Sequence, residues 1–322
     1  MSTAFFYSPH FLEHRQRPHH PERPERLEAI VKAVKEVGLW ERLDHRAFES
    51  ASEADLATCH TRAHIERVKT LAQQGGGDLD GDTHVSPVSF EVARLAVGAA
   101  IEACRVVMAG EAKNAFVACR PCGHHAESGR DPDSPWGFCL FNNVAVTARV
   151  AQRDFGAKKI AILDFDVHHG NGTQEIFYTD GSVLFVSLHQ SPLFPGTGGT
   201  SERGEGAGKG TTLNYPLPSG SNGAIYHRVW GQVGSKVREF APDLIILSGG
   251  YDAHEGDPLA NMSLQADDFA ALVWDAQSWA NELCQGKLVA VLEGGYDLDA
   301  LAASVVMTLG VLSGSIEEEL HG

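Results

Sequence analysis

One short segment in the middle of the chain ends an apolar run with side chains that can bind metal ions or protons. The apolar run is Ile160 to Leu163, and the polar side chains after it belong to Asp164, Asp166, His168, His169 and Asn171. Alternate side chains of an extended segment point to opposite sides, so Asp164, Asp166 and His168 face one way and the apolar residues between them face the other. The segment therefore predicts carboxylate and imidazole chemistry on one side and packing on the other.

Three residues offer the ligands of a catalytic metal ion. Asp166, His168 and Asp252, here called the metal triad, supply two carboxylates and one imidazole. Three protein ligands with one open coordination position are typical of a catalytic zinc ion rather than a structural one. Such an ion can polarise a carbonyl group and lower the pKa of bound water toward neutrality. For each residue alone, a strand-end side chain that caps a helix is the ordinary alternative, but the triad and the tandem histidines nearby together favour the metal.

Other residues could move protons or stabilise charge beside such an ion. His124 and His125 suit general base and general acid work because an imidazole titrates near neutral pH. Asp164 and Asn171 could orient these rings by hydrogen bonds. Tyr296 could donate its hydroxyl to a developing oxyanion, although a tyrosine taken alone is more often a packing residue.

These chemical groups all follow predicted strands. In chain order they are Gly123 to His125, Asp164 to His169, Ser187 to His189, Tyr251 and Asp252, and Gly295 and Tyr296. Open parallel sheets bind ligands in the crevice outside the carboxyl ends of their strands. The sequence therefore predicts that these five segments, the first with His124 and the last with Tyr296, converge on one site.

The elements that must position this site alternate along the chain. We expect strands at 4–7, 114–119, 158–165, 183–189, 244–248 and 287–292, and helices at 25–37, 63–73, 88–108, 143–153, 223–240, 266–284 and 297–311. The strands are continuous aliphatic runs, which is typical of a sheet covered by helices on both faces. This order predicts a three-layer α/β/α fold with a mainly parallel central sheet, in a single catalytic domain spanning residues 1–322. Loops 75–87 and 190–212 show no readable structure.

Composition and charge exclude several classes of function. Hydrophobic residues make up 43% of the 322 residues, as in an ordinary soluble globular protein. The 42 acidic and 26 basic residues give a net charge of −16, which argues against a broad phosphate-binding surface and hence against direct nucleic-acid binding. No run approaches the roughly 18 apolar residues that cross a bilayer, and the N-terminus has no export signal. We expect a cytoplasmic protein with no membrane partner.

The six cysteines do not form a disulfide framework in a chain of this length. Cys119 and Cys122 have CxxC spacing, which can indicate a redox pair or half of a zinc site. A structural zinc site needs a second pair of ligands, and the sequence has no second CxxC. We therefore interpret the two as small residues at a strand end and leave them out of the site.

Two other enzyme classes share part of the central segment. Asp164-Phe-Asp166 is similar to the DxD start of aspartyl-phosphate phosphatases, but His168 stands where these enzymes have Thr or Val. Asp166-Val-His168 is similar to the binuclear manganese motif DxHxD of arginases, but Gly170 stands where the bridging carboxylate is needed. Both alternatives are weaker than a site with one metal ion.

The chain resembles the zinc-dependent histone deacetylase superfamily, and within it the class II-like bacterial histone deacetylase-like amidohydrolases. The matching segments run in family order over nearly the whole chain: 20–27 (HPERPERL), 120–126 (RPCGHHA), 137–143 (GFCLFNN), 164–174 (DFDVHHGNGTQ), 187–189 (SLH), 194–198 (FPGTG), 250–254 (GYDAH) and 293–296 (EGGY). The resemblance implies an arginase/deacetylase-like version of the three-layer fold.

The resemblance also implies a role for each matching residue. Zn²⁺ would bind the metal triad, His125 would act as general base and acid, His124 would be its electrostatic neighbour, and Tyr296 would polarise the acyl oxygen. A structural K⁺ is implied as well, held by Asp164, Ser187 and the main chain of Asp166, His168 and Leu188.

Four further residues are implied to contact the substrate. Phe138 and His189 would line a narrow tunnel for an acyl-lysine-like chain, Leu259 would lie at its rim, and Asp82 would hold the substrate backbone or amine. Leu259 is apolar, whereas one acetylpolyamine-specific branch has an acidic residue there. This difference favours acyl-lysine over a polyamine.

Two departures from the family pattern lie beside the predicted base. Asn171 stands where class I members have Asp, and a neutral partner stabilises a histidine cation less than a carboxylate does. Cys122 replaces the second proline of the RPPGHH motif.

The sequence thus predicts a Zn²⁺-dependent amidohydrolase that removes acetyl or similar small acyl groups from acyl-lysine-type amines. Its substrate would be a small molecule or peptide with an acylated amine, and an oligomer is compatible with the sequence. One alternative is an acetylpolyamine or other small N-acyl-amine amidohydrolase. A catalytically silent module that binds acylated ligands is a third.

Overall fold

An eight-stranded sheet forms the centre of the protein in the computed structural model, which describes residues 2–131 and 133–316. All its strand pairs are parallel. In sheet order the strands are β2 (Asp44–His45), β1 (Thr3–Phe6), β5 (Asn114–Val117), β10 (Leu288–Leu292), β9 (Leu244–Gly249), β6 (Ile160–Asp164), β7 (Val183–Gln190) and β8 (Thr212–Leu217).

The central strands are buried on both faces. Every residue of β5, β6, β9 and β10 is buried, because these runs are mostly aliphatic and helices cover both sides of the sheet. In the register of the sheet, Asp164 at the end of β6 lies opposite Ser187 of β7 and Ser248 of β9. The polar strand ends therefore come together along one edge of the sheet.

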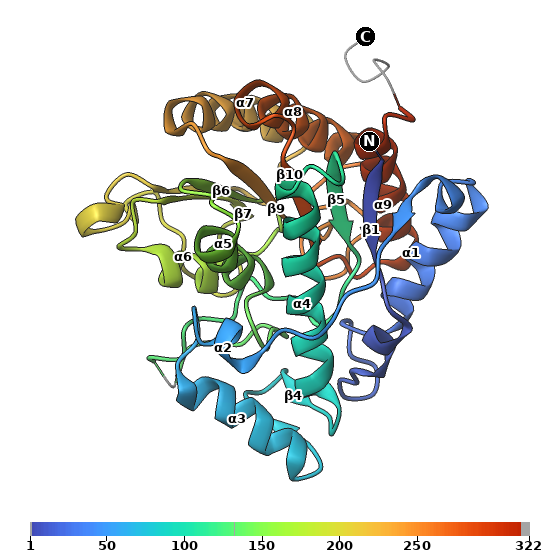
Figure 1. The fold of residues 1–322 in the computed structure, drawn as a ribbon, viewed down its shortest axis with the longest axis vertical. Helices are drawn as coiled ribbons and strands as arrows, with labels where there is room; N and C mark the ends of the chain where they lie inside the picture. The colour runs from blue at the N-terminus through green and yellow to red at the C-terminus, as the bar shows by residue number, and fades with distance from the viewer. Residues whose placement is uncertain (1, 132, 317–322) are drawn as a thin grey trace.

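Helices form the outer layers of the fold. They are α1 (Glu25–Glu36), α2 (Glu53–Leu56), α3 (Arg62–Gln73), α4 (Ser89–Met108), α5 (Asn143–Asp154), α6 (Asn171–Phe177), α7 (Gly223–Phe240), α8 (Ala266–Cys284) and α9 (Leu298–Ser313), with short 3-10 turns at Pro9–Glu13, Trp40–Arg42 and Gly206–Gly208. In Figure 1, α4 lies in front of the sheet and packs on α5, whereas α9 lies behind it and packs between α1 and α8. The predicted three-layer fold with a parallel sheet is confirmed.

Several elements were not predicted from the sequence. The edge strands β2 and β8 are absent from the expected list, because β2 has two residues and β8 contains Pro216, which weakens a strand pattern and is tolerated at an edge. The loop at 75–87 holds a small antiparallel hairpin of β3 (Gly77–Asp78) and β4 (His84–Val85). Helix α6 was missed because its first residues, Asn171 and Gly172, are poor helix formers.

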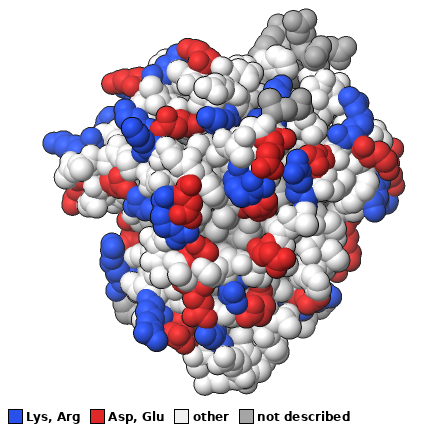
Figure 2. Space-filling view, viewed as in Figure 1, with Lys and Arg blue, Asp and Glu red and all other residues white. Residues whose placement is uncertain are grey.

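The surface matches the mixed charge of the sequence. Figure 2 shows acidic and basic side chains interspersed over the face turned toward the viewer. Among the described residues, no helix is both long and apolar enough to cross a membrane.

Candidate active site

The predicted site residues meet where four neighbouring strands end. His124 and His125 follow β5, Tyr296 follows β10, Asp252 follows β9, and Asp166 and His168 follow β6, in the order in which these strands lie side by side. A cavity of about 200 Å³ opens onto this edge. Its walls are formed by Asp82, His125, Gly137, Phe138, His168, Leu193, Phe194, Leu259 and Tyr296.

The metal triad is assembled and buried. The ligand atoms of Asp166, His168 and Asp252 all lie within 4.8 Å of one another. The Nδ1 atom of His168 is 3.1 Å from Oδ1 of Asp166 and 3.1 Å from Oδ2 of Asp252. A tetrahedral zinc ion with bonds of about 2.0–2.1 Å separates its ligand atoms by roughly 3.3 Å, so these gaps fit such an ion.

The electrostatics of the triad also fit a cation. Burial and the nearby Asp166 carboxylate raise the pKa of Asp252 to about 7. Burial alone would lower the pKa of His168, but hydrogen bonds to Asp166 and Asp252 raise it to about 10. Two buried carboxylates this close together need a positive charge between them. A divalent ion supplies that charge, and the residues present therefore fit the implied zinc.

Two glycines allow the strands to close around the triad. A Cβ atom at Gly250 would lie 2.1 Å from Oδ2 of Asp166, and one at Gly294 would lie 2.2 Å from Oδ2 of Asp252. The Gly294 amide instead donates a hydrogen bond of 2.8 Å to Asp166. Any larger side chain would occupy the space of a ligand oxygen.

Each of the tandem histidines has its own oxygen partner. The Nδ1 atom of His124 lies 3.0 Å from Oδ2 of Asp164, and that of His125 lies 2.8 Å from Oδ1 of Asn171. Burial alone would lower the pKa of His124, but the carboxylates of Asp166 and Asp164 raise it well above its usual value. Burial, together with the charges of His124 and His168, lowers the pKa of His125 well below its usual value. At neutral pH the structure therefore favours a charged His124 beside a neutral His125.

Tyr296 faces the cavity from a braced turn. Its amide donates a 2.7 Å hydrogen bond to Asp257, and the guanidinium of Arg26 lies 4.9 Å from the centre of its ring. Arg26 also donates to the carbonyl oxygens of Gly295 and Glu293, each at 2.6 Å. Burial raises the pKa of Tyr296 well above its usual value, so the hydroxyl keeps its proton and can donate.

Three of the four predicted substrate residues line the cavity. Asp82, Phe138 and Leu259 belong to its wall, and the Phe138 ring packs edge-on to that of Tyr296 at 5.9 Å. His189 does not line it, which differs from the prediction. Its two ring nitrogens lie 2.9 Å from Oγ of Ser187 and 3.1 Å from the carbonyl oxygen of Gly198, inside the protein.

Phe194 lines the cavity, although the sequence did not predict it there. Its ring packs edge-on to His125 at 5.1 Å, and 39% of the residue is exposed. Leu193 lies beside it in the same wall. The signal was present, because Phe194 opens the FPGTG segment that matches the family, but that segment was not assigned to the tunnel.

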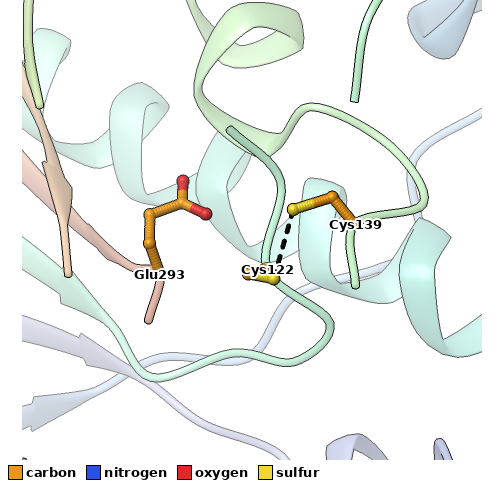
Figure 3. A group of neighbouring side chains, drawn as sticks. All are labelled: Cys122, Cys139 and Glu293. Atoms are coloured by element: carbon orange, nitrogen blue, oxygen red, sulfur yellow. Dashed lines mark hydrogen bonds between the residues drawn. The ribbon is translucent and has the colours of Figure 1, made fainter. Parts of the chain in front are cut away.

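Cys122, Cys139 and Glu293 form a buried cluster directly before the tandem histidines (Figure 3). The sulfur of Cys122 lies 3.2 Å from that of Cys139, so Cys122 contacts Cys139 rather than forming a CxxC pair with Cys119. The Glu293 carboxylate accepts hydrogen bonds from the amides of Gly123 (2.7 Å) and His124 (3.1 Å) and from Ser248 (2.8 Å). Its oxygens are therefore occupied in holding this turn, a function that the sequence did not reveal.

Two of the residues expected around K⁺ lie side by side in the sheet. Asp164 and Ser187 are register partners in β6 and β7, and Oδ1 of Asp164 accepts the amide of Asp166 at 3.1 Å. Leu188 follows in β7. The potassium site stays a prediction.

Comparison with known proteins agrees with this geometry. Residues 20–312 match the histone deacetylase domain. A probable deacetylase of Archaeoglobus fulgidus is 40% identical over 316 residues, covering 97% of this chain and 86% of that protein. A histone deacetylase-like amidohydrolase of Pseudomonas aeruginosa is 40% identical over 313 residues, covering 91% of this chain and 81% of that protein.

A solved structure is similar over the same range. The crystal structure of the HDA15 HD domain superposes with a TM-score of 0.90 at 36% identity, covering 98% of this chain and 89% of that chain. The fold is thus the arginase/deacetylase fold. With the domain match, the relatives and the site agreeing, the chain belongs to the histone deacetylase family.

Proposed function

We propose that this protein is a Zn²⁺-dependent amidohydrolase that removes acetyl or similar small acyl groups from acyl-lysine-type amines. The observation that carries the proposal is the shared cavity, in which His125, His168 and Tyr296 face one space lined by Phe138 and Phe194. A base, a metal ligand and a hydroxyl donor around one narrow space are the parts that hydrolysis of an amide requires.

Zn²⁺ would be held by Asp166, His168 and Asp252, and when bound it supplies a Lewis acid that polarises the acyl carbonyl and acidifies water. The remaining chemistry belongs to side chains of the chain itself. Val167 donates its amide to Oδ1 of Asp252 at 2.8 Å, which leaves Oδ2 for the ion. The main chain thus orients a ligand before the ion arrives.

His125 is the proposed general base and general acid. Its Nδ1–H donates to Asn171, which leaves Nε2 without a proton in the neutral ring. Nε2 takes a proton from the attacking water and later gives it to the leaving amine. The charged His124 beside it opposes a second positive charge, which favours release of that proton to the amine.

Tyr296 is the proposed oxyanion donor. Its hydroxyl stays protonated and donates a hydrogen bond to the acyl oxygen as negative charge develops there. Phe138 and Phe194 exclude water from the alkyl chain of the substrate, and Asp82 at the cavity wall accepts a hydrogen bond from its backbone or amine.

Leu259 favours acyl-lysine over acetylpolyamine. It is apolar and lies in the cavity wall, so it offers no carboxylate to a second ammonium group of a polyamine. An acetylpolyamine or small N-acyl-amine hydrolase remains the second candidate. A silent binding module is the third, and the complete set of base, triad and hydroxyl donor speaks against it.

The decisive experiment measures hydrolysis of an acetyl-lysine peptide and of acetylspermidine in parallel, with metal analysis of the purified protein. We expect about one zinc per chain and faster turnover of the peptide. A large preference for acetylspermidine would reverse our order of substrates. Absence of turnover on both, with zinc bound, would support the binding module.

Three further parts of the proposal concern the cellular location, the partner and a second cation. The described cysteines are all buried, unpaired thiols, which supports a reducing, cytoplasmic location. The proposed partner is a small molecule or peptide with an acylated amine, with no direct contact to nucleic acid or membrane. A structural K⁺ near Asp164, Ser187 and Leu188 also belongs to the proposal.

A further inference from the structure

Glu127 lies directly behind the proposed base, in a contact that the sequence did not suggest. The Nδ2 atom of Asn171 donates a hydrogen bond of 2.7 Å to Oε1 of Glu127, and Oδ1 of the same amide lies 2.8 Å from Nδ1 of His125. The amide of Asn171 therefore joins the carboxylate to the imidazole. Asn171 is buried, whereas Glu127 is partly exposed and reaches this contact from the loop before α5.

The chemistry of the two end groups decides which way the amide points. An asparagine amide presents an acceptor on one side and a donor on the other, and the two orientations have nearly the same shape. An ionised carboxylate can only accept, so Glu127 requires the nitrogen of Asn171 on its side. The oxygen must then face His125, whose Nδ1 must carry the proton.

The reverse orientation would place the proton of His125 on the other nitrogen. A flipped amide would donate to Nδ1, and the neutral ring would then carry its hydrogen on Nε2. Nε2 is the nitrogen that Asn171 leaves for the cavity, and with a hydrogen on it the ring cannot accept a proton there. Nδ2 of Asn171 also lies 3.4 Å from the carbonyl oxygen of His125, a longer contact that favours the same orientation. The 2.7 Å bond to Glu127 is the shorter of the two, and it is the one made to a carboxylate.

The surrounding loop holds Glu127 in place. Its second carboxylate oxygen accepts the hydroxyl of Ser134, and its carbonyl oxygen lies 2.9 Å from Nδ1 of His60. Nε2 of His60 in turn accepts the amide of Asn142 at 2.9 Å, at the residue that caps α5. The main chain of Glu127 is thus fixed to the start of a core helix, and its carboxylate is held by Ser134 on the side away from Asn171.

We propose that Glu127 is a positioning residue, whose carboxylate orients the Asn171 amide and thereby keeps the proton of His125 on Nδ1. Its kinetic consequence rests on the proposed function, but the position of the proton does not. The contact also gives a physical reason why a neutral Asn171 suffices where other family members have Asp.

The test compares variants that change the donor and acceptor pattern. Glu127→Leu removes the acceptor and is expected to lower kcat by about 10- to 100-fold with little change in KM. Glu127→Gln keeps an accepting oxygen but can also donate, so it is expected to lose less activity than Glu127→Leu. Glu175→Leu is the matched control, because Glu175 holds Ser128 of the same loop at 2.9 Å without contacting Asn171.

A reciprocal exchange separates orientation from simple loop support. Asn171→Asp sets two carboxylates against each other where the amide now donates, and its activity is expected to fall. Adding Glu127→Gln to Asn171→Asp restores a donor between them, so the double variant is expected to regain most of the lost activity. A merely structural role of Glu127 would give no such rescue.

The proton position is read directly from ¹H–¹⁵N spectra of the imidazole nitrogens of His125. We expect the Nδ1–H form in the unsubstituted protein and a shift toward the Nε2–H form in Glu127→Leu. Unchanged spectra and a kcat within about twofold in Glu127→Leu, or the absence of rescue in the double variant, would overturn the proposal. If the unsubstituted protein hydrolyses no acyl amine, the proposed function fails, while the spectra still decide the role of Glu127.

Discussion

Replacing Tyr296 by Phe is the sharpest test of the proposed chemistry. The change removes one hydroxyl and keeps the ring, so its contacts with Arg26 at 4.9 Å and Phe138 at 5.9 Å persist. The Tyr296 amide bond to Asp257 is a main-chain contact and is unaffected. We therefore expect almost no change in the free energy of unfolding.

The expected loss of activity follows from the role of the hydroxyl. Loss of one donor to a developing oxyanion costs about 3–4 kcal/mol of transition-state stabilisation, which corresponds to a 100- to 1,000-fold lower kcat. KM is expected to change little, because the bond strengthens only as charge develops. Zinc content should stay near one per chain, because Tyr296 is not one of the proposed ligands.

The assay is steady-state hydrolysis of an acetyl-lysine peptide, with zinc content and thermal unfolding measured on the same preparations. Tyr251→Phe is the matched control, because the hydroxyl of Tyr251 bonds to Thr308 at 3.1 Å in the core and does not face the cavity. It should lose about 1 kcal/mol of stability and keep its activity. Equal kcat in Tyr296→Phe and the unsubstituted protein would refute the assignment of the oxyanion donor.

Three further predictions concern the metal, the glycines beside it and pH. Removing metal with a chelator should abolish hydrolysis and lower the melting temperature, and added Zn²⁺ should restore both; activity that survives complete metal removal would contradict the proposal. Gly294→Ala should lose most bound zinc because its Cβ would meet a ligand oxygen of Asp252, whereas Gly256→Ala, with its nearest atom at 3.5 Å, should bind zinc normally. Burial lowers the pKa of His64 from 6.5 to about 4, so the unfolded state binds more protons between these values and the free energy of unfolding falls as pH drops through this window. Between pH 7 and pH 5 the contribution is on the order of 2 kcal/mol, and denaturant unfolding at these two pH values should show a smaller pH dependence in His64→Gln; an identical dependence would contradict it.

The fold could be predicted because its central strands are long apolar runs. Runs such as Ile160–Asp164 and Leu288–Leu292 carry enough aliphatic residues to be identified as strands buried on both faces. The two edge strands could not, because β2 is held by its pairing with β1 alone and β8 by its pairing with β7. Such pairing depends on the finished sheet and leaves little trace in a short, mixed sequence.

Sequence indicates the site residues whose side chains can themselves bind a metal ion, move a proton or donate a hydrogen bond. The sequence paired the tandem histidines with Asp164 and Asn171 on their residue types, and in the structure both lie within hydrogen-bonding distance of these rings. Phe194 and Glu127 were missed as site residues, because a phenylalanine wall and a carboxylate behind an amide are defined by what lies next to them in space. Sequence shows which groups can react, whereas the groups that orient them are recognised only from contacts.

The position of β10 has a consequence for the order in which the protein can fold. Within residues 2–131 and 133–316 this strand is the last in sequence, yet it lies in the middle of the sheet, between β5 and β9. During synthesis the sheet cannot become continuous until β10 is available. The strand that leads to His124 and His125 is hydrogen-bonded to the strands that lead to the metal triad only through β10. A chain that stops before Leu288 would lack the strand that joins these two parts of the sheet, so we expect it to assemble no complete site.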